Sequence, residues 1–303
     1  MENKSLAVIQ EVDSMLPGVE SLKQMKVVAD YMVLAKMLPP GYKDGNDLMV
    51  VALRGREMGV PLGQAIRKVG AALGAGCTII VKGAEETPSA IVAMAHAFHD
   101  AGLPPGVLNI VWGVPSDVSE HLIGSPIVRK ISFTGSVPVG KHLAAMAGAQ
   151  MKRMTMELGG HAPVIVFDDA DIKHAATMLA RFKLRNAGQV CISPSRFFIH
   201  EKIYDQFVTH FIDVMSKVTI GNGIDDASEM GPMLHERRVK LMQEFVDDAL
   251  TLGAKVLLGG SRLDRVGHFY PPTVLADLPA DARILHEEPF GPIAALVRFS
   301  DTE

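Results

Sequence analysis

The chain has 303 residues, 48% of them hydrophobic and 21% charged, with a formal net charge of -4. This charge does not favour nucleic-acid binding, which needs a basic excess, and no apolar run reaches the ~18 residues of a membrane span. Two widely spaced cysteines, Cys77 and Cys191, do not form the framework of a secreted disulfide-rich domain. The first residues lack the pattern of a signal peptide, so we expect a soluble protein in the cytoplasm.

Residues 1–66 are predicted to be helical. Apolar residues recur at helical spacing over residues 21–38, and the prolines and glycine of Pro39–Gly41 end that pattern. A second helix is expected up to Met58, before Gly59 and Pro61.

From Arg67 onwards, short β-branched runs alternate with helical patterns. We expect strands at Thr78–Val81, Leu108–Val111, Lys130–Phe133 and Met154–Leu158, with helices over Pro88–Ala101, 116–124 and Gly135–Ala147. A second set comprises strands at Pro163–Val166, Phe197–Ile199 and Lys255–Leu258, and helices over Asp171–Asn186, Tyr204–Val218 and Leu234–Leu252. Such alternation predicts an α/β fold with a doubly wound parallel sheet.

Two short segments could carry chemistry. Cys191 follows Gly188-Gln189-Val190, and most such cysteines are small buried side chains, although an environment that favours the thiolate makes one a nucleophile. Glu157 lies at the expected end of a strand, before the glycines of the run Leu158–Gly160. There it could act as a base, because ligands bind at the carboxyl ends of parallel strands. The alternative is a strand that ends in a glycine turn.

Two further segments could bind a dinucleotide. The run Phe133–Ser136 leads from a strand into a helix with Gly140 further along, and the N–H groups of such a helix start can face a pyrophosphate. Lys82 and Glu85 follow the first strand, where a carboxylate can bind ribose hydroxyls. The alternatives are an ordinary turn and a solvated ion pair.

Taken in order, several segments resemble the aldehyde dehydrogenase family. They are GAGCTIIVKGAEETPSA, AGLPPGVLNIVWG, ISFTGSVPVGKHL, MELGGHAPVIVFDDADI, RNAGQVC and EEPFGP. The resemblance runs from Arg67 to Glu303. It implies a partial Rossmann-like dinucleotide-binding domain over residues 67–158 and a truncated catalytic domain over 159–303, preceded by a foreign helical segment over 1–66.

The resemblance also implies the roles of individual residues. Cys191 would attack the aldehyde and Glu157 would activate the water that hydrolyses the resulting thioester. The expected cofactor is NAD, with NADP possible, and no metal is expected. The implied cofactor-binding residues are Lys82, Glu85, Thr134, Gly135, Ser136, Gly140, Leu158, Gly159, Glu288 and Phe290.

Within the family, the chain looks most like the succinate-semialdehyde dehydrogenases. These enzymes hold the distal carboxylate of the substrate with two arginines, which match Arg67 and Arg185. A guanidinium group binds a carboxylate in a bidentate fork, so the assignment is chemically sensible. The alternative is that both arginines lie at the surface. A small-molecule aldehyde is the expected partner, and homo-oligomers are typical of the family.

The chain also departs from the family. The residues before Arg67, MGVPLGQAI, lack the Pro-Trp-Asn motif that supplies an oxyanion donor, and Gly83 replaces the usual proline. Residues 1–66 weakly resemble phage RecT-like annealing proteins. The alternative function is therefore an inactive, truncated or fused dehydrogenase remnant that acts as a binding or interaction protein, or a gene-model artefact. On that ground, very low turnover is expected.

Overall fold

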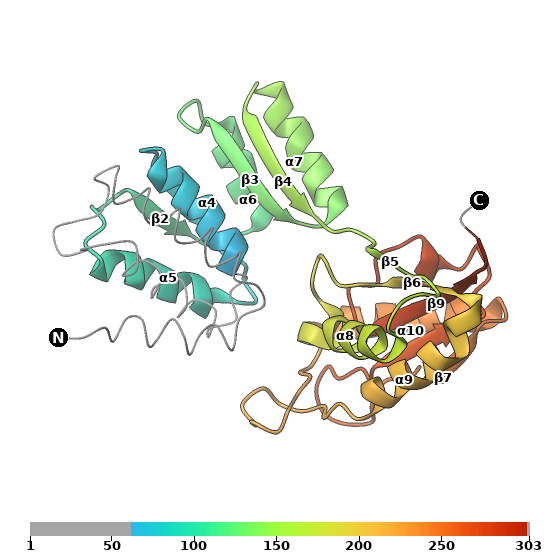
Figure 1. Cartoon of the computed structure of the whole chain (residues 1–303). Helices are drawn as coiled ribbons and strands as arrows, with labels where there is room; N and C mark the ends of the chain where they lie inside the picture. Colours follow the sequence, from blue (N-terminus) through green and yellow to red (C-terminus); the bar gives the residue numbers. More distant parts are fainter. Residues whose placement is uncertain (1–61, 302–303) are drawn as a thin grey trace. The chain divides into compact units, whose positions relative to one another are not determined.

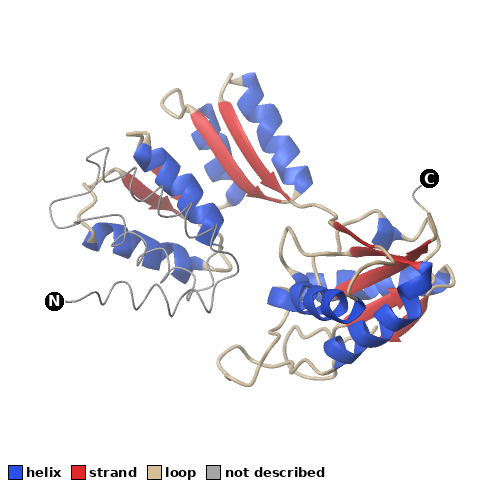
Figure 2. Cartoon of the chain, viewed as in Figure 1, coloured by secondary structure: helices blue, strands red, loops and turns tan. Residues whose placement is uncertain are grey.

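The computed structural model describes residues 62–301 (Figures 1 and 2). The helices expected over residues 21–38 and up to Met58, and the RecT-like resemblance, therefore lie outside the described residues. Helix α4 (Leu62–Gly74) runs across the expected boundary at residue 66, and the domain division made there stays a prediction. The described residues divide into two compact units, with those up to Ser132 and Leu143–Thr155 in the first, and Phe133–His142 and those from Met156 onwards in the second.

The first unit contains a short parallel sheet. Its strands are β1 (Ile79–Lys82) and β2 (Leu108–Val111), which pair in parallel with Ile79 opposite Leu108. The connection is helix α5 (Pro88–Asp100), which begins with a proline, the residue whose missing N–H is harmless at a helix start. Val69 and Leu73 of α4 pack with Met94 of α5 in a small core. Helix α6 (Pro115–Gly124) follows β2.

Strands β3 (Lys130–Gly135) and β4 (Arg153–Leu158) form a second two-stranded sheet, and helix α7 (Val137–Ala149) connects them. The division between the two units passes through both strands. Lys152 ties this β-α-β region to the preceding loop, because its Nζ donates to the carbonyls of Ser125 at 2.5 Å and Val128 at 2.6 Å. The strands described before Leu158 thus lie in two separate pairs, where a single sheet was expected.

The second unit contains a five-stranded mixed sheet in the order β5-β6-β9-β8-β7 (Figure 1). The strands are β5 (Pro163–Val166), β6 (Arg196–His200), β7 (Lys255–Leu258), β8 (Thr273–Ala276) and β9 (Ile293–Phe299). Only β7 is antiparallel to its neighbour, and the other pairs are parallel. The long helices are α8 (Ile172–Leu184), α9 (Tyr204–Ser216) and α10 (Glu236–Thr251).

The main core joins this sheet to its helices. Phe207 and Phe211 of α9 are fully buried and stack on one another with their ring centroids 5.5 Å apart. Phe197 of β6 meets Phe211 edge-on at 5.2 Å. Burial of each aromatic ring contributes roughly 1.5–3 kcal/mol. This core fixes α8 and the sheet, and both carry residues of the site.

The α/β class and the expected elements after residue 67 are confirmed, with ends that differ by a few residues. Asp171 caps α8 as predicted, because its carboxylate accepts the His174 N–H at 3.0 Å. The helix ends at Leu184, however, and the expectation that it reaches Asn186 was wrong. Strands β8 and β9 were not predicted.

Candidate active site

Cys191 lies in a tight turn that follows a sharp kink. After α8, the segment Arg185–Gly188 turns through left-handed conformations, with φ of 51° at Asn186, 53° at Ala187 and 73° at Gly188. The turn over Val190–Ser193 is then closed by the Ser193 N–H, which donates to the Val190 carbonyl at 2.8 Å. Cys191 occupies a central position of this turn as a free, partly buried thiol. The kink therefore moves the chain out of the helix and leaves the thiol on a short, fixed loop.

Gln189 fixes this loop to a distant segment. Its side-chain amide donates to the Asn186 carbonyl at 3.2 Å, and its Oε1 accepts the Leu234 N–H at 2.9 Å. Sequence patterns did not single out Gln189 for this role, since its partner lies 45 positions along the chain. These contacts fix the residue before Val190 and so hold the loop of Cys191 in place.

Glu288 brings two of the predicted motifs together. Its carboxylate lies against Gly159, so that any side chain at this position would collide with it. Burial raises the pKa of Glu288, while an N–H bond from Gly160 and the positive charges of Arg238 and Lys183 oppose that rise. Gly159 is in turn bonded to Gly135 through its N–H, at 3.3 Å. Because Gly159 has no side chain, the Glu288 carboxylate can lie against it while its N–H bonds to Gly135 at the end of β3.

Arg238 supports the segment that carries Glu288. Its guanidinium donates to the carbonyls of Pro289 and Phe290, the latter at 3.1 Å, and lies 5.6 Å from the centre of the Phe290 ring. Phe290 itself has a positive φ of 44°. Sequence patterns missed Arg238, which lies on α10, far along the chain from the segment that it holds.

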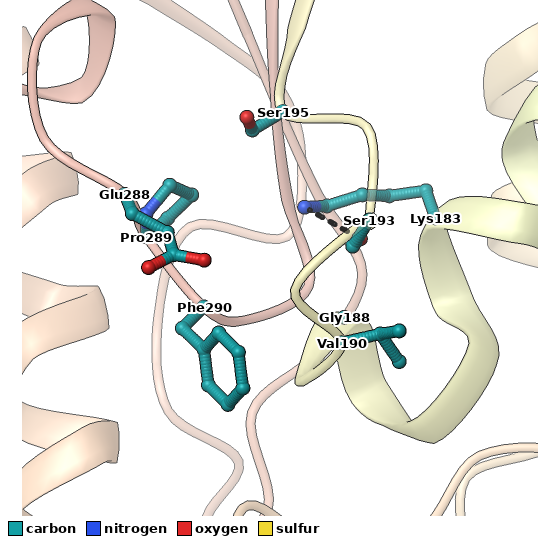
Figure 3. Close-up of a pocket in the computed structure, with 8 residues that line it drawn as sticks. All are labelled: Lys183, Gly188, Val190, Ser193, Ser195, Glu288, Pro289 and Phe290. Carbon is teal, nitrogen blue, oxygen red and sulfur yellow. Dashed lines mark hydrogen bonds between the residues drawn. The ribbon is translucent and has the colours of Figure 1, made fainter. Parts of the chain in front are cut away.

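A small pocket lies between the loop of Cys191 and the Glu288 segment (Figure 3). We call it the Lys183 pocket, and its walls include Lys183, Ser193, Ser195 and the run Glu288–Phe290. Lys183 extends from α8 into this pocket, and its amine donates to the Ser193 hydroxyl at 3.4 Å. The sequence offered one signal for Lys183: it continues the buried stripe of Ala176, Leu179 and Ala180 at helical spacing.

The other predicted site residues of the second unit lie near the end of the β3–β4 pair. Glu157 is exposed on β4, next to Leu158. The Leu158 side chain packs so closely on Gly140 of α7 that a Cβ on Gly140 would overlap it. Thr134 and Ser136 flank Gly135 at the step from β3 into α7. That Glu157 and Cys191 face one cleft stays a prediction.

Lys82 and Glu85 belong to the first unit and form an ion pair with each other. The hydrogen bond from Lys82 lowers the pKa of Glu85, which remains half-exposed. Beside them, the Trp112 ring lies over Gly83, where any Cβ would overlap the indole. The ring therefore gives a structural reason for glycine where the family usually has proline.

The two predicted substrate arginines differ in what the structure describes. Arg185 is exposed at the kink after α8. Arg67 lies in α4, but its side chain is outside the described residues. Its predicted role is therefore untested.

Among residues 62–301, no group of three or more His, Cys, Asp or Glu side chains could hold a metal ion. In the same part of the chain, no helix is both long and apolar enough to cross a membrane. Cofactor binding would suit the step from β3 into α7, because the first N–H groups of a helix have no partner within it and attract phosphate.

Comparison with known proteins identifies the family. Residues 59–303 match the model of the aldehyde dehydrogenase family. Relatives include a putative 4-(hydroxymethyl)benzenesulfonate dehydrogenase of Comamonas testosteroni, 45% identical over 80% of this chain and 50% of the relative. Another is the NADP(+) succinate-semialdehyde dehydrogenase of Escherichia coli K12, 42% identical over 80% of this chain and 50% of the relative. The chain thus spans about half the length of these curated relatives.

Solved structures agree with this assignment. A succinate-semialdehyde dehydrogenase from Burkholderia pseudomallei is 44% identical, with a TM-score of 0.76 over 78% of this chain and 49% of that one. An NADP-dependent enzyme of Escherichia coli gives a TM-score of 0.78 at 42% identity, over 80% of this chain and 50% of that one. The family model covers well over half of the chain, so this chain belongs to the aldehyde dehydrogenase family.

Proposed function

We propose that this chain carries the nucleophile and cofactor-binding residues of an NAD(P)-dependent enzyme that oxidises a semialdehyde to the carboxylic acid. The observation that carries the proposal is the loop of Cys191. A free thiol sits in a closed turn whose end residues, Val190 and Ser193, line a pocket, and the Glu288 segment forms the other wall of that pocket. A thiol held in this way can form a covalent intermediate and divide a difficult oxidation into two easier steps.

In the proposed reaction, the Cys191 thiolate attacks the aldehyde carbon, and the carbonyl oxygen takes up a proton to give a thiohemiacetal. Bound NAD(P) would supply the acceptor for the hydride of this carbon; with loss of the hydroxyl proton, the carbon would become that of a thioester held by Cys191. Glu157 then takes a proton from water, which attacks the thioester carbon. The carbon–sulfur bond breaks, the acid leaves, and Cys191 returns as the thiol or thiolate.

Two segments of the chain would bind the cofactor. Gly135, Ser136 and Thr134 would face the pyrophosphate at the start of α7, and Lys82 with Glu85 would meet the adenosine ribose. Glu85 favours NAD over NADP in this proposal, because its ionised carboxylate would repel a 2′-phosphate. Its lowered pKa keeps that carboxylate charged at neutral pH.

The proposed substrate carries an acidic group at the end opposite the aldehyde. The names of the relatives mention succinate semialdehyde, glutarate semialdehyde and sulfolactaldehyde, which are all aldehydes with an acid group. Arg185 supports this choice, since it lies six positions before Cys191 and is exposed. Arg67 is the second proposed carboxylate ligand. Both cysteines of the chain are free thiols, which fits a reducing compartment such as the cytoplasm. We also propose the homo-oligomer that is typical of the family.

The test is rapid mixing of the chain with NAD and succinate semialdehyde, with NADH measured over time. Unchanged protein should form NADH, at the low rate expected without the Pro-Trp-Asn motif, and Cys191→Ala should form none. Glu157→Gln should form at most one NADH for each active site and then stop, because the thioester would form but water would not be activated. Continued turnover by Cys191→Ala would refute the nucleophile, and full turnover by Glu157→Gln would refute the base.

Substrate class has a separate test. Arg185→Ala should raise KM for succinate semialdehyde by roughly tenfold or more, because a charge-assisted hydrogen bond is lost. KM for an uncharged aldehyde such as butanal should stay unchanged. Equal rises for both aldehydes would contradict the proposed role of Arg185.

A further inference from the structure

Lys183 is buried to a degree that is rare for lysine. Only 1% of its surface is exposed, although lysine is almost never fully buried without a partner. The Ser193 hydroxyl accepts a hydrogen bond from its amine, and the carboxylate of Glu288 attracts its charge. The pocket therefore offers an amine both a hydroxyl and a carboxylate as partners. If packing alone mattered, an apolar side chain would fill the position of Lys183 at less cost.

Lys183 is linked to the turn of Cys191 through a single residue, Ser193. Ser193 is the residue whose N–H closes the turn around Cys191, and its side chain takes the hydrogen bond from Lys183. Figure 3 shows the lysine side chain crossing the pocket toward the loop of Ser193 and Ser195, with Glu288 on the opposite wall. The Lys183 amine therefore contacts the last residue of the Cys191 turn and is attracted by the carboxylate of Glu288.

We propose that Lys183 is a positioning residue for Cys191: its amine anchors the Val190–Ser193 turn through the Ser193 hydroxyl and supplies positive charge that Glu288 balances. Lys183 can play this role only if Cys191 is the nucleophile, as proposed above. A fixed turn presents the thiol in one geometry, and a charged amine holds the Ser193 hydroxyl more strongly than a neutral one.

The Lys183 amine should lose its charge near neutral pH. Burial lowers the pKa of Lys183 to about 7, and the attraction of Glu288 opposes the fall. Two neighbouring charged or titratable groups act on the same pocket. Burial, with the charges of Arg196 and Lys183, lowers the pKa of His161 to about 4. Arg238, like Lys183, attracts the negative charge of Glu288. Near pH 7, His161 is therefore neutral. Lys183 carries its charge below about pH 7 and loses it above.

The experiment measures alkylation of Cys191 by iodoacetamide in the full chain, from about pH 6 to about pH 9. Cys77 is exposed, lies in the first unit and serves as the reference thiol within the same molecule. Peptide mass spectrometry then gives the ratio of the Cys191 rate to the Cys77 rate. This readout does not depend on turnover or on bound cofactor.

Three variants separate charge from packing. Lys183→Met keeps the length without the charge, Lys183→Arg keeps the charge at every pH, and Ser193→Ala removes the acceptor while leaving Lys183 buried. Below pH 7, Lys183→Met and Ser193→Ala should lower the rate ratio by about three- to tenfold, because each removes the charge-assisted hydrogen bond that anchors the turn. Lys183→Arg should keep the rate ratio of the unchanged protein. It should also remove the change in that ratio near pH 7 that we expect from loss of the Lys183 charge. Near-UV circular dichroism checks that each variant folds. If Lys183→Met does not fold, Ser193→Ala still tests the anchoring hydrogen bond.

Several outcomes would overturn the role of Lys183. They are an unchanged ratio in Lys183→Met and Ser193→Ala, or a ratio that falls equally at every pH, which would indicate packing alone. If Cys191 of the unchanged protein reacted no faster than Cys77 at any pH, the nucleophile assignment itself would fail, and the role of Lys183 with it. A fast Cys191 that ignores all three variants would refute Lys183 only.

Discussion

Replacing Gly188 with alanine should destabilise the second unit more than any similar change at an open glycine. Gly188 has a φ of 73°, a backbone conformation that other residues rarely adopt, and a Cβ there would overlap the Gly291 carbonyl oxygen and lie 2.5 Å from its carbon. These are backbone atoms, so no change of rotamer can relieve the overlap. Either the Cys191 loop or the Glu288 segment must move.

The size of the effect follows from two terms. A left-handed conformation costs a residue with a Cβ about 1–2 kcal/mol, and overpacking adds about 1–3 kcal/mol. We therefore expect Gly188→Ala to lower the free energy of unfolding by about 3 kcal/mol. Gly253→Ala is the matched control, because Gly253 has a φ of 99° and nothing within 4 Å of its Cβ. It should lose only about 1 kcal/mol.

The assay is urea denaturation followed by near-UV circular dichroism, with Cys191 alkylation measured on the folded proteins. Gly188→Ala should shift the denaturation midpoint further than Gly253→Ala and should also change the Cys191 rate, which Gly253→Ala should leave alone. Equal losses of stability in the two variants would show that the approach of Gly188 to Gly291 is not tight, and the reasoning would fail.

Three other changes test separate parts of the structure. Phe207→Ala should lower the free energy of unfolding by about 3–5 kcal/mol in urea denaturation, because it leaves a cavity beneath the sheet; a loss below 1 kcal/mol would contradict the described core. Burial lowers the pKa of His161 from the usual 6.5 to about 4 in the folded protein. The folded protein therefore binds fewer protons between these values, and stability should fall by up to about 3 kcal/mol as pH drops from 6.5 to 4. His161→Gln should flatten that slope in denaturation series, and an unchanged slope would exclude His161 as its source. Glu85→Gln should strengthen NADP binding several-fold relative to NAD in calorimetry, whereas an unchanged preference would count against its contact with the ribose.

The sequence predicted those elements whose pattern is local. Strand Leu108–Val111 and strand Lys255–Leu258 were predicted with their observed ends, because each is a short apolar run bounded by turn residues. Strand β8 was missed, since every residue in Thr273–Ala276 is buried and its run lacks the alternation that marks a half-exposed strand. The kink at Asn186 was missed because its left-handed backbone depends on contacts made by Gln189 with a segment far along the chain.

The site was predictable to a similar degree. Motifs gave Glu288 and Gly159 as separate cofactor residues, and only the structure shows their contact. Lys183 and Arg238 escaped attention because charged residues on helices are usually solvated. Lys183 falls on the buried stripe of α8, however, and a charge on such a stripe is a signal that a sequence can supply.

The indole that covers Gly83 also makes the two units optically distinct. Trp112 is the single tryptophan of the chain, lies in the first unit and is 41% exposed. Tyr204 and Tyr270 are buried in the second unit, so fluorescence excited at the red edge of tryptophan absorption reports on the first unit alone. Unfolding followed by that emission and by ellipticity should therefore give two midpoints wherever the units unfold independently. The same emission should respond to a nucleotide bound beside Lys82.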